Sequence, residues 1–219
     1  MDTILVISVL SAALLHAFWN FQVKDTPNKA VGMAAVCFGH LPLAGIGLFY
    51  SGLPSINAAP YLLASALLHV GYQIFLLNSY RFGSLTSIYP IARGLAPLLI
   101  TLVSFMALNV ELKTSQMLGI FIISGAIICY GISQYRRADA ELTGVVLACV
   151  TSCFIAGYSV VDAIGARITG DAIAFYGVST FSSGVLFAIY LQMTNPGVLL
   201  NFHKQARSTL IYGGTASYL

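Results

Sequence analysis

Apolar runs of about twenty residues, repeated along almost the whole chain, constrain the fold of this sequence more than any other feature. A membrane-spanning helix needs about 20 apolar residues to cross a hydrocarbon core of roughly 30 Å. Seven such runs follow one another between short polar segments: Ile4–Phe21, Ala30–Tyr50, Tyr61–Tyr80, Leu85–Leu108, Ser115–Tyr135, Thr143–Ile164 and Ala172–Met193. We therefore predict an all-α, multi-pass membrane helical bundle.

Composition excludes the other broad classes of protein. Charged residues make up 8% of the chain and hydrophobic residues 58%, whereas a soluble protein carries about 25% charge. So few charges cannot cover the surface of a soluble fold. A disordered protein and a nucleic-acid-binding protein are excluded for the same lack of charge. The net charge of +3 comes from scattered residues, which suits loops that meet anionic lipid headgroups. The lipid bilayer is the expected surrounding, and we expect no nucleic-acid partner.

A weak internal repeat indicates two related units. A shift of 139 positions aligns Ala17 and Trp19 with Ala156 and Tyr158. Ser208–Leu219 begins an eighth helix but spans only about 18 Å. An odd number of helices in the first unit would insert the second unit upside down, as in many secondary transporters. We predict a five-helix repeat over 1–138 and an incomplete inverted repeat over 139–219, with seven full helices and part of an eighth.

Polar side chains inside the apolar runs are the candidate binding residues. Ionisable and amide groups at membrane depth are costly, so each is a functional hypothesis. Several come in pairs four residues apart, which share one helix face. A shared aqueous cavity would satisfy all of them, and we predict that it is lined by His16, Trp19, Asn20, His69, Tyr72, Gln73, Tyr89, Arg93, Tyr158 and Asp162.

Two of these residues have competing interpretations. Arg93 either faces the cavity, where it binds an anionic group or pairs with Asp162, or lies near a later helix start and extends to a headgroup. Asp162 either lines the cavity or meets water at the end of its helix. His16 and His69 either line the pathway or form hydrogen bonds between helices. A coupling proton is compatible with histidine, whose pKa lies near 6.5. His40 has no polar partner one turn away and is expected to be structural.

Signatures of enzymes and cofactors are absent from the sequence. It contains no His-Glu-x-x-His, Gly-x-Ser-x-Gly or phosphate-binding glycine loop with lysine. Cys149 and Cys153 share a helix face, but two soft ligands without a third make a poor metal site. We expect no metal, no cofactor and no catalytic residue. Glycines such as Gly39 and Gly119 are expected to allow close helix packing.

Three segments resemble the EamA-type transporters of the drug/metabolite transporter superfamily. The run Ser-Leu-Thr-Ser-Ile-Tyr-Pro-Ile-Ala-Arg-Gly-Leu-Ala-Pro from Ser84 to Pro97, followed by Glu111 and Gly119, resembles that family's fourth and fifth helices. Residues 13–20 resemble its first helix, and residues 155–167 its sixth. The resemblance implies two inverted five-helix repeats around a central cavity, with Glu111 as a helix-end and packing residue. This chain departs from the pattern by stopping in its eighth helix.

The function that the resemblance implies is secondary transport. A small polar, amino-acid-like metabolite would cross the inner or plasma membrane, in the direction of efflux, by alternating access. Arg93 would orient a substrate carboxylate or phosphate. Two alternatives stay open. The first is a fragment that is inactive or works only when it assembles with another copy. The second is a membrane-embedded enzyme that acts on a lipid-linked substrate near His203 and Lys204.

Loop charges and the family resemblance imply opposite orientations. Alternating loops place Lys24, Lys29, Arg81, Arg136, Arg137, Lys204 and Arg207 on one side of the membrane, and Lys113 and Arg167 on the other. The positive-inside rule then puts the first side in the cytoplasm and the N-terminus outside. Members of the family are expected to begin inside.

Overall fold

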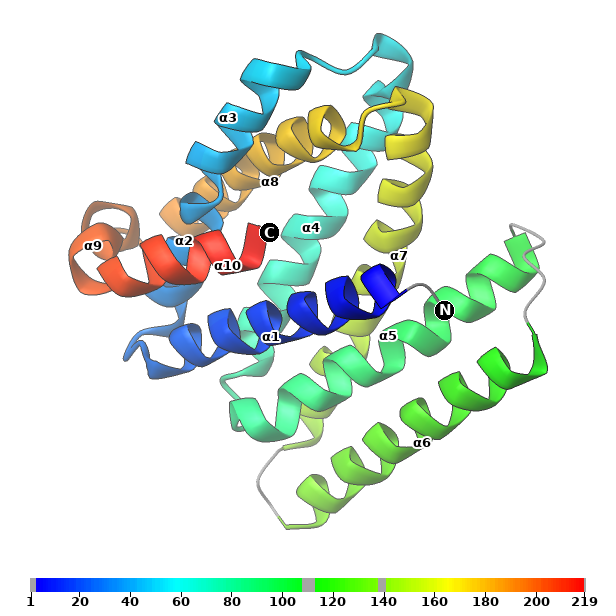
Figure 1. Cartoon of the computed structure of the whole chain (residues 1–219). Coiled ribbons are helices and arrows are strands. Elements are labelled where there is room, and N and C mark those ends of the chain that lie inside the picture. Colours follow the sequence, from blue (N-terminus) through cyan, green and yellow to red (C-terminus); the bar gives the residue numbers. More distant parts are fainter. Residues whose placement is uncertain (1–2, 108–112, 138–140, 219) are drawn as a thin grey trace. The chain divides into compact units, whose positions relative to one another are not determined.

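Helices joined by short turns make up the part of the chain that the structure describes, residues 3–107, 113–137 and 141–218 (Figure 1). The structure is a computed structural model. It contains seven helices or helix pairs long and apolar enough to cross a membrane, and each predicted apolar run coincides with one of them. The prediction of a multi-pass helical membrane protein is thus confirmed. Leu108, Glu111 and Asp139 lie outside the described residues.

The helices form two compact units, which we describe one at a time. The first unit comprises Met1–Ser55 and Asp171–Leu219, and the second comprises Ile56–Gly170. This division differs from the order of the two predicted repeats, because each unit combines helices from both. The inverted repeat over 1–138 and 139–219 stays a prediction.

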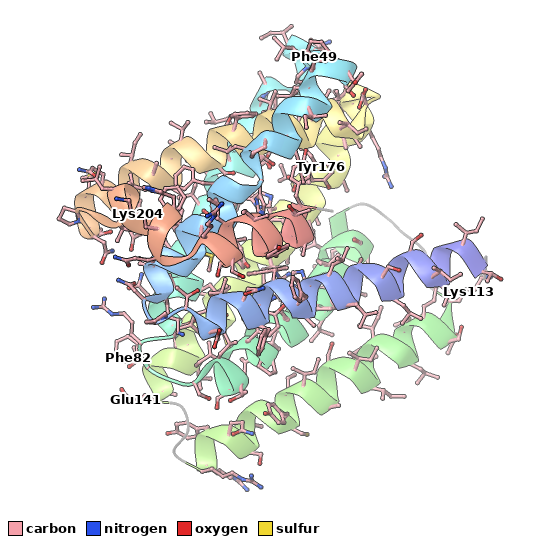
Figure 2. All side chains as sticks on the ribbon, turned by 60° about the vertical axis from the view of Figure 1, so that its left-hand side comes forward. Phe49, Phe82, Lys113, Glu141, Tyr176 and Lys204 are labelled. Carbon is pink, nitrogen blue, oxygen red and sulfur yellow. The ribbon has the colours of Figure 1, made fainter. Side chains whose placement is uncertain are left out.

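The second unit is built from four long helices. They are α4 (Ala59–Ser79), α5 (Leu85–Ala107), α6 (Thr114–Arg136) and α7 (Leu142–Thr169), and the short 3-10 helix η1 (Ile56–Ala58) precedes them. α7 packs along both α4 and α5, and α6 packs on α5. Figure 1 shows α6 beside α5. The backbone N–H of Glu141, just before α7, donates to the Phe82 carbonyl at 2.7 Å, and both residues are labelled in Figure 2.

Glycine brings α4 and α7 together at the level of the candidate site. A Cβ built on Gly71 of α4 would lie 2.6 Å from Cδ1 of Phe154 on α7. The Phe154 ring is itself stacked on Phe75 of α4, with ring centroids 5.2 Å apart. Only a residue without a side chain fits between the ring and the α4 backbone.

The first unit contains α1 (Thr3–Asp25), α2 (Lys29–Gly39), α3 (Leu41–Ser51) and α8 (Ala172–Thr194). Short helices complete it: α9 (Val198–Gln205), the π-helix η2 (Thr209–Gly213) and α10 (Gly214–Tyr218). α3 packs along α8, and α2 contacts α1, α9, η2 and α10. The predicted start of an eighth helix at Ser208 is confirmed by η2 and α10.

The second apolar run is two helices, not the single helix that the sequence predicts. α2 ends at Gly39 and α3 begins at Leu41, with His40 between them. Pro42 lies in the first turn of α3. Proline has no N–H to donate and its ring clashes with the carbonyl four residues earlier, so a helix breaks ahead of it. His40 is therefore at a break, where its ring lies 5.9 Å from that of Tyr218.

Two further boundaries differ from the predictions. The segment around Lys204, expected to be a loop, forms α9, and Figure 2 labels Lys204 on it. α7 continues to Thr169, five residues beyond the predicted end at Ile164, and stops at Gly170 with φ of 73°. Asp162 is consequently about two turns inside its helix and is 2% exposed. The interpretation that Asp162 meets water at a helix end was wrong.

Side-chain caps start the helices that follow the first and sixth apolar runs. The Asn28 side chain accepts from the backbone N–H groups of Ala30 and Val31 at the start of α2. Asp171 accepts from those of Ile173 and Ala174 at the start of α8. The hydrogen bond from Ala174, supported by Ser51 and Ile173, holds the pKa of Asp171 below its usual range. Capping of this kind satisfies N–H groups that the helix leaves unpaired.

Candidate functional site

Six of the predicted binding residues meet in the second unit. His69 and Tyr72 come from α4, Tyr89 and Arg93 from α5, and Tyr158 and Asp162 from α7. We call these six residues the polar cluster. They meet because each helix carries two of them within one turn, and because α7 packs along both other helices.

A histidine and a carboxylate form one half of the polar cluster. Nε2 of His69 lies 3.0 Å from Oδ2 of Asp162. The Asp162 side chain is 3% exposed and that of His69 is 26% exposed. The imidazole also stacks on the Tyr158 ring, with centroids 4.1 Å apart and planes 18° from parallel. The pair therefore joins α4 to α7 through both a polar contact and a ring contact.

A guanidinium surrounded by tyrosines forms the other half. Nη2 of Arg93 donates to the Tyr72 hydroxyl at 3.3 Å, and the Tyr158 hydroxyl is a further hydrogen-bond partner. Cζ of Arg93 lies 5.6 Å from the centre of the Tyr72 ring and 5.7 Å from that of Tyr89. At these distances the ring faces attract a cation. Among the described residues, the positive charge is solvated by neutral groups and has no carboxylate beside it.

This geometry decides between the interpretations of Arg93. α5 begins at Leu85, so more than two turns of helix precede Arg93 and the proposed later helix start was wrong. Asp162 contacts His69 rather than Arg93, so the alternative in which Arg93 pairs with Asp162 was wrong as well. The Tyr72 and Tyr158 rings meet edge to face at 5.7 Å and connect the two halves of the cluster.

Two prolines loosen the backbone of α5 on either side of Arg93. Pro90 and Pro97 lie inside the helix, and each lacks the N–H that would bond the carbonyl four residues earlier. For Pro90 that carbonyl belongs to Thr86, and the Tyr130 hydroxyl of α6 donates to it at 3.2 Å. For Pro97 it belongs to Arg93 itself. The cation of the cluster thus lies where the helix hydrogen bonding is interrupted.

Ser152 of α7 supports the same stretch of α5, and no sequence pattern singles it out. Its hydroxyl is fully buried and lies 2.7 Å from the Ala92 carbonyl and 3.1 Å from the Ala148 carbonyl. A serine in an apolar run is unremarkable by itself. Its position became informative only when α7 was placed against the proline-containing part of α5.

Buried polar atoms of this unit lack partners within the described residues. They are Oδ1 of Asp162, Nε of Arg93, Oε1 of Gln73, and the hydroxyl groups of Tyr80 and Ser124. Gln73 is 8% exposed and lies one residue beyond Tyr72 on α4. A buried polar group without a hydrogen bond costs about 1–3 kcal/mol. The unit therefore has unsatisfied hydrogen-bond donors and acceptors close to a positive charge.

The other three predicted residues lie in the first unit. Nε1 of Trp19 donates to Nδ1 of His16 at 3.1 Å, and Nδ2 of Asn20 donates to the His16 carbonyl at 2.6 Å. Trp19 also packs in a core cluster with Val23, Val36 and Ala216. These contacts account for Trp19 as a packing residue whose N–H is satisfied within α1.

Comparison with known proteins identifies no relative, so the function has to be inferred from the sequence and the structure. No protein-family model, no curated protein and no solved structure matches the chain. Within the described residues, no three His, Cys, Asp or Glu side chains are grouped so that they could hold a metal ion. The seven apolar helices identify a multi-pass membrane protein, with one polar cluster built from three of them.

Proposed function

We propose that this protein is a secondary transporter of small polar, amino-acid-like metabolites, of the EamA type in the drug/metabolite transporter superfamily. The proposed path crosses the inner or plasma membrane in the direction of efflux, by alternating access. The observation that carries the proposal is Arg93, a cation within a membrane-spanning helix, surrounded by Tyr72, Tyr89 and Tyr158 and with no carboxylate beside it in the part of the chain that the structure describes.

The cost of burying charge supports a functional role for this cluster. An arginine at the centre of a membrane helix costs about 2.5–3.5 kcal/mol on insertion scales. If Arg93 served packing alone, an apolar residue would fill the space at lower cost. Tyrosine hydroxyls and ring faces solvate the guanidinium but leave its charge uncompensated. A substrate carboxylate would supply that charge through paired hydrogen bonds, for which the guanidinium geometry is suited.

The arrangement of helices also favours transport. α5 is interrupted by Pro90 and Pro97, and secondary transporters place substrates at discontinuous helices near the middle of the membrane. The residues of the rival enzyme interpretation, His203 and Lys204, are exposed in the last turn of α9. That turn offers a surface rather than an enclosed site, which supports transport over catalysis.

Counterflow in proteoliposomes tests the proposal. Vesicles loaded with unlabelled L-amino acids and diluted into a radiolabelled mixture of them should accumulate label when they carry the wild-type protein. Arg93→Ala should lower this uptake at least tenfold, and Arg93→Lys should fall between the two because lysine keeps the charge but not the paired donors.

Arg81→Ala is the matched control. Arg81 is exposed after α4, and its guanidinium donates to the Asn78 side chain at 3.4 Å, so its loss should leave counterflow unchanged. Insertion of each variant is checked by its yield in washed membranes and its elution in detergent. Wild-type counterflow by well-inserted Arg93→Ala would refute the role of Arg93, and absence of counterflow by the wild-type protein would refute transport of this substrate class.

A further inference from the structure

We propose that the His69–Asp162 pair is a proton-binding site whose occupancy is linked to an anion bound at Arg93. This inference rests on the proposed function, because it assigns a coupling ion to the same polar cluster. Two observations carry it. The titratable side chains are in contact at 3.0 Å, and Oδ1 of Asp162 is buried without a hydrogen-bond partner in the described part of the chain.

The chemistry of the pair allows a proton to bind and leave. Without an added proton, the pair is a carboxylate beside a neutral imidazole and carries one negative charge in a buried position. Burial of such a charge is unfavourable. One proton, passed through the imidazole to Oδ1 of Asp162, makes the pair neutral overall. On Oδ1 it also turns an unused acceptor into a hydroxyl donor.

The exposure of the two side chains gives the proton a path. His69 is 26% exposed, whereas Asp162 is 3% exposed. A proton from water would therefore reach the imidazole first and the carboxylate through it. Histidine is suited to this role because its charge changes between about pH 5 and 8.

The groups that face the pair come from three helices. α7 contributes Tyr158, which stacks on His69, and α4 contributes Tyr72, which meets Tyr158 edge to face. α5 contributes Arg93, which contacts Tyr72, and Tyr89, whose ring lies beside Arg93.

The other two elements of the unit add no charge at this point. Near Arg93, α6 places the apolar Ile127 side chain against Gly94, and its Tyr130 hydroxyl donates to the Thr86 carbonyl about two turns before Arg93. η1 consists of Ile56, Asn57 and Ala58 and has no titratable side chain. Among the described side chains around the pair, the fixed charge is therefore that of Arg93.

That charge links the two binding events. The positive charge of Arg93 opposes the uptake of a further positive charge by the pair. An anion bound at Arg93 removes the opposition, so it favours proton binding, and by thermodynamic reciprocity a bound proton favours the anion. Tyr72 and Tyr158 lie between the two sites, and a change at either site alters their contacts with the other.

Infrared difference spectroscopy of the full chain in lipid vesicles tests the proton site without any substrate. Acidification from about pH 8 to about pH 5 should produce a carbonyl stretching band of a protonated carboxyl group that shifts in heavy water. Asp162→Asn should lose this band. Asp171→Asn is the matched control: its side chain still caps α8, and because hydrogen bonds lower the pKa of Asp171, the wild-type residue stays ionised over this range.

His69→Gln keeps the test decisive if Asp162→Asn fails to fold. Glutamine still donates to Oδ2 of Asp162 but cannot titrate, so the carboxyl band should remain and appear at a different pH. The proton site is refuted if the wild-type protein gives no carboxyl band, if Asp162→Asn keeps it, or if the band of His69→Gln is unchanged.

Counterflow then tests the link to substrate. An imposed pH gradient should change the rate of labelled L-amino-acid counterflow by the wild-type protein and by Asp171→Asn, and should have no effect on Asp162→Asn. Equal sensitivity of Asp162→Asn would refute the linkage. If the wild-type protein shows no counterflow, the proposed function fails, and the infrared result alone decides the proton site.

Discussion

At the scale of single residues, the main feature of the polar cluster is that Arg93 and Asp162 contact other groups and not each other. A direct pair between them would neutralise both charges and close the site. Instead Asp162 contacts His69 at 3.0 Å and Arg93 contacts Tyr72 at 3.3 Å. The separation leaves a positive and a negative group in one cluster, each with a buried atom available to another partner.

Tyr72→Phe tests whether the hydroxyl that holds the guanidinium matters for transport. The substitution keeps the ring beside Arg93 and removes the acceptor of its Nη2 hydrogen bond. A hydrogen bond to a charged group is worth about 1.5–3 kcal/mol, and 1.4 kcal/mol is a factor of ten. We expect counterflow at sub-saturating substrate to fall about tenfold, measured in proteoliposomes.

Tyr130→Phe is the control for that variant. It also removes a tyrosine hydroxyl of the second unit, but this one donates to the Thr86 carbonyl. It should lower thermal stability slightly and leave counterflow near the wild-type rate. An equal loss in both variants would show that any weakening of α5, rather than the contact to Arg93, reduces transport.

The sequence located most residues of the cluster but not their partners. Pairs four residues apart, such as Tyr89 with Arg93 and Tyr158 with Asp162, indicate a shared face because helix periodicity fixes it. Which faces meet depends on packing between helices far apart in the chain, and no local pattern encodes it. The contact of His69 with Asp162 was for that reason beyond prediction, as was the role of Ser152.

At the scale of elements, close approach of α4 and α7 holds the cluster together. Gly71 lies between His69 and Tyr72, and the Phe154 ring occupies the space where a side chain would be. Sequence reasoning expected close packing at Gly119 of α6, yet a Cβ there would meet nothing within 4 Å. A glycine pattern indicates that close packing is allowed, and only the neighbouring helix decides where it is used.

Gly71→Leu tests that approach. The larger side chain must displace the Phe154 ring from Phe75 or separate α4 from α7, and overpacking of this kind costs about 1–3 kcal/mol. We expect the free energy of unfolding, measured by denaturant titration in mixed micelles, to fall by that amount, and the carboxyl band of the His69–Asp162 pair to change.

Two further variants complete the test. Gly119→Leu is the same substitution at an open position, and it should change the free energy of unfolding by less than about 0.5 kcal/mol. Adding Phe154→Ala to Gly71→Leu should restore part of the loss, because it vacates the space that leucine needs. Full stability of Gly71→Leu would show that α4 and α7 tolerate a wider separation.

At the scale of the whole molecule, seven membrane-spanning segments impose an alternation of loops that can be measured. Arg81 and Lys204 follow the third and seventh segments, whereas Lys113 precedes the fifth. The positive-inside rule places the first two in the cytoplasm and Lys113 outside. In a background with every cysteine replaced by serine, Lys113→Cys should react with an impermeant maleimide in intact cells.

Arg81→Cys and Lys204→Cys should react only after the cells are opened. The reverse pattern would contradict the loop charges and support the orientation that the family resemblance implies, with the N-terminus inside. Labelling of Arg81→Cys and Lys204→Cys from opposite sides would contradict the seven-segment topology itself.

The sequence was sufficient for the number of segments and insufficient for their internal detail. About twenty apolar residues per crossing follow from the thickness of the bilayer, so length alone places each span. The break at His40 had a sequence signal in Pro42, but the same residue type interrupts α5 without ending it. α9 has too few residues to span a membrane, and its packing against α2 and α8 decides that it is a helix.

The tyrosines around Arg93 also bear on how the chain enters the membrane during synthesis. A segment with a central arginine is poorly inserted by itself, at a cost of about 2.5–3.5 kcal/mol. Tyr72 belongs to α4, which leaves the ribosome before α5, and Tyr89 belongs to α5 itself. The two aromatic partners of Arg93 are therefore already in the chain when it reaches the translocon, before α7 has been made. His69 is likewise synthesised ahead of Asp162, so each charged residue of the cluster enters the bilayer after its partner on α4 has been made.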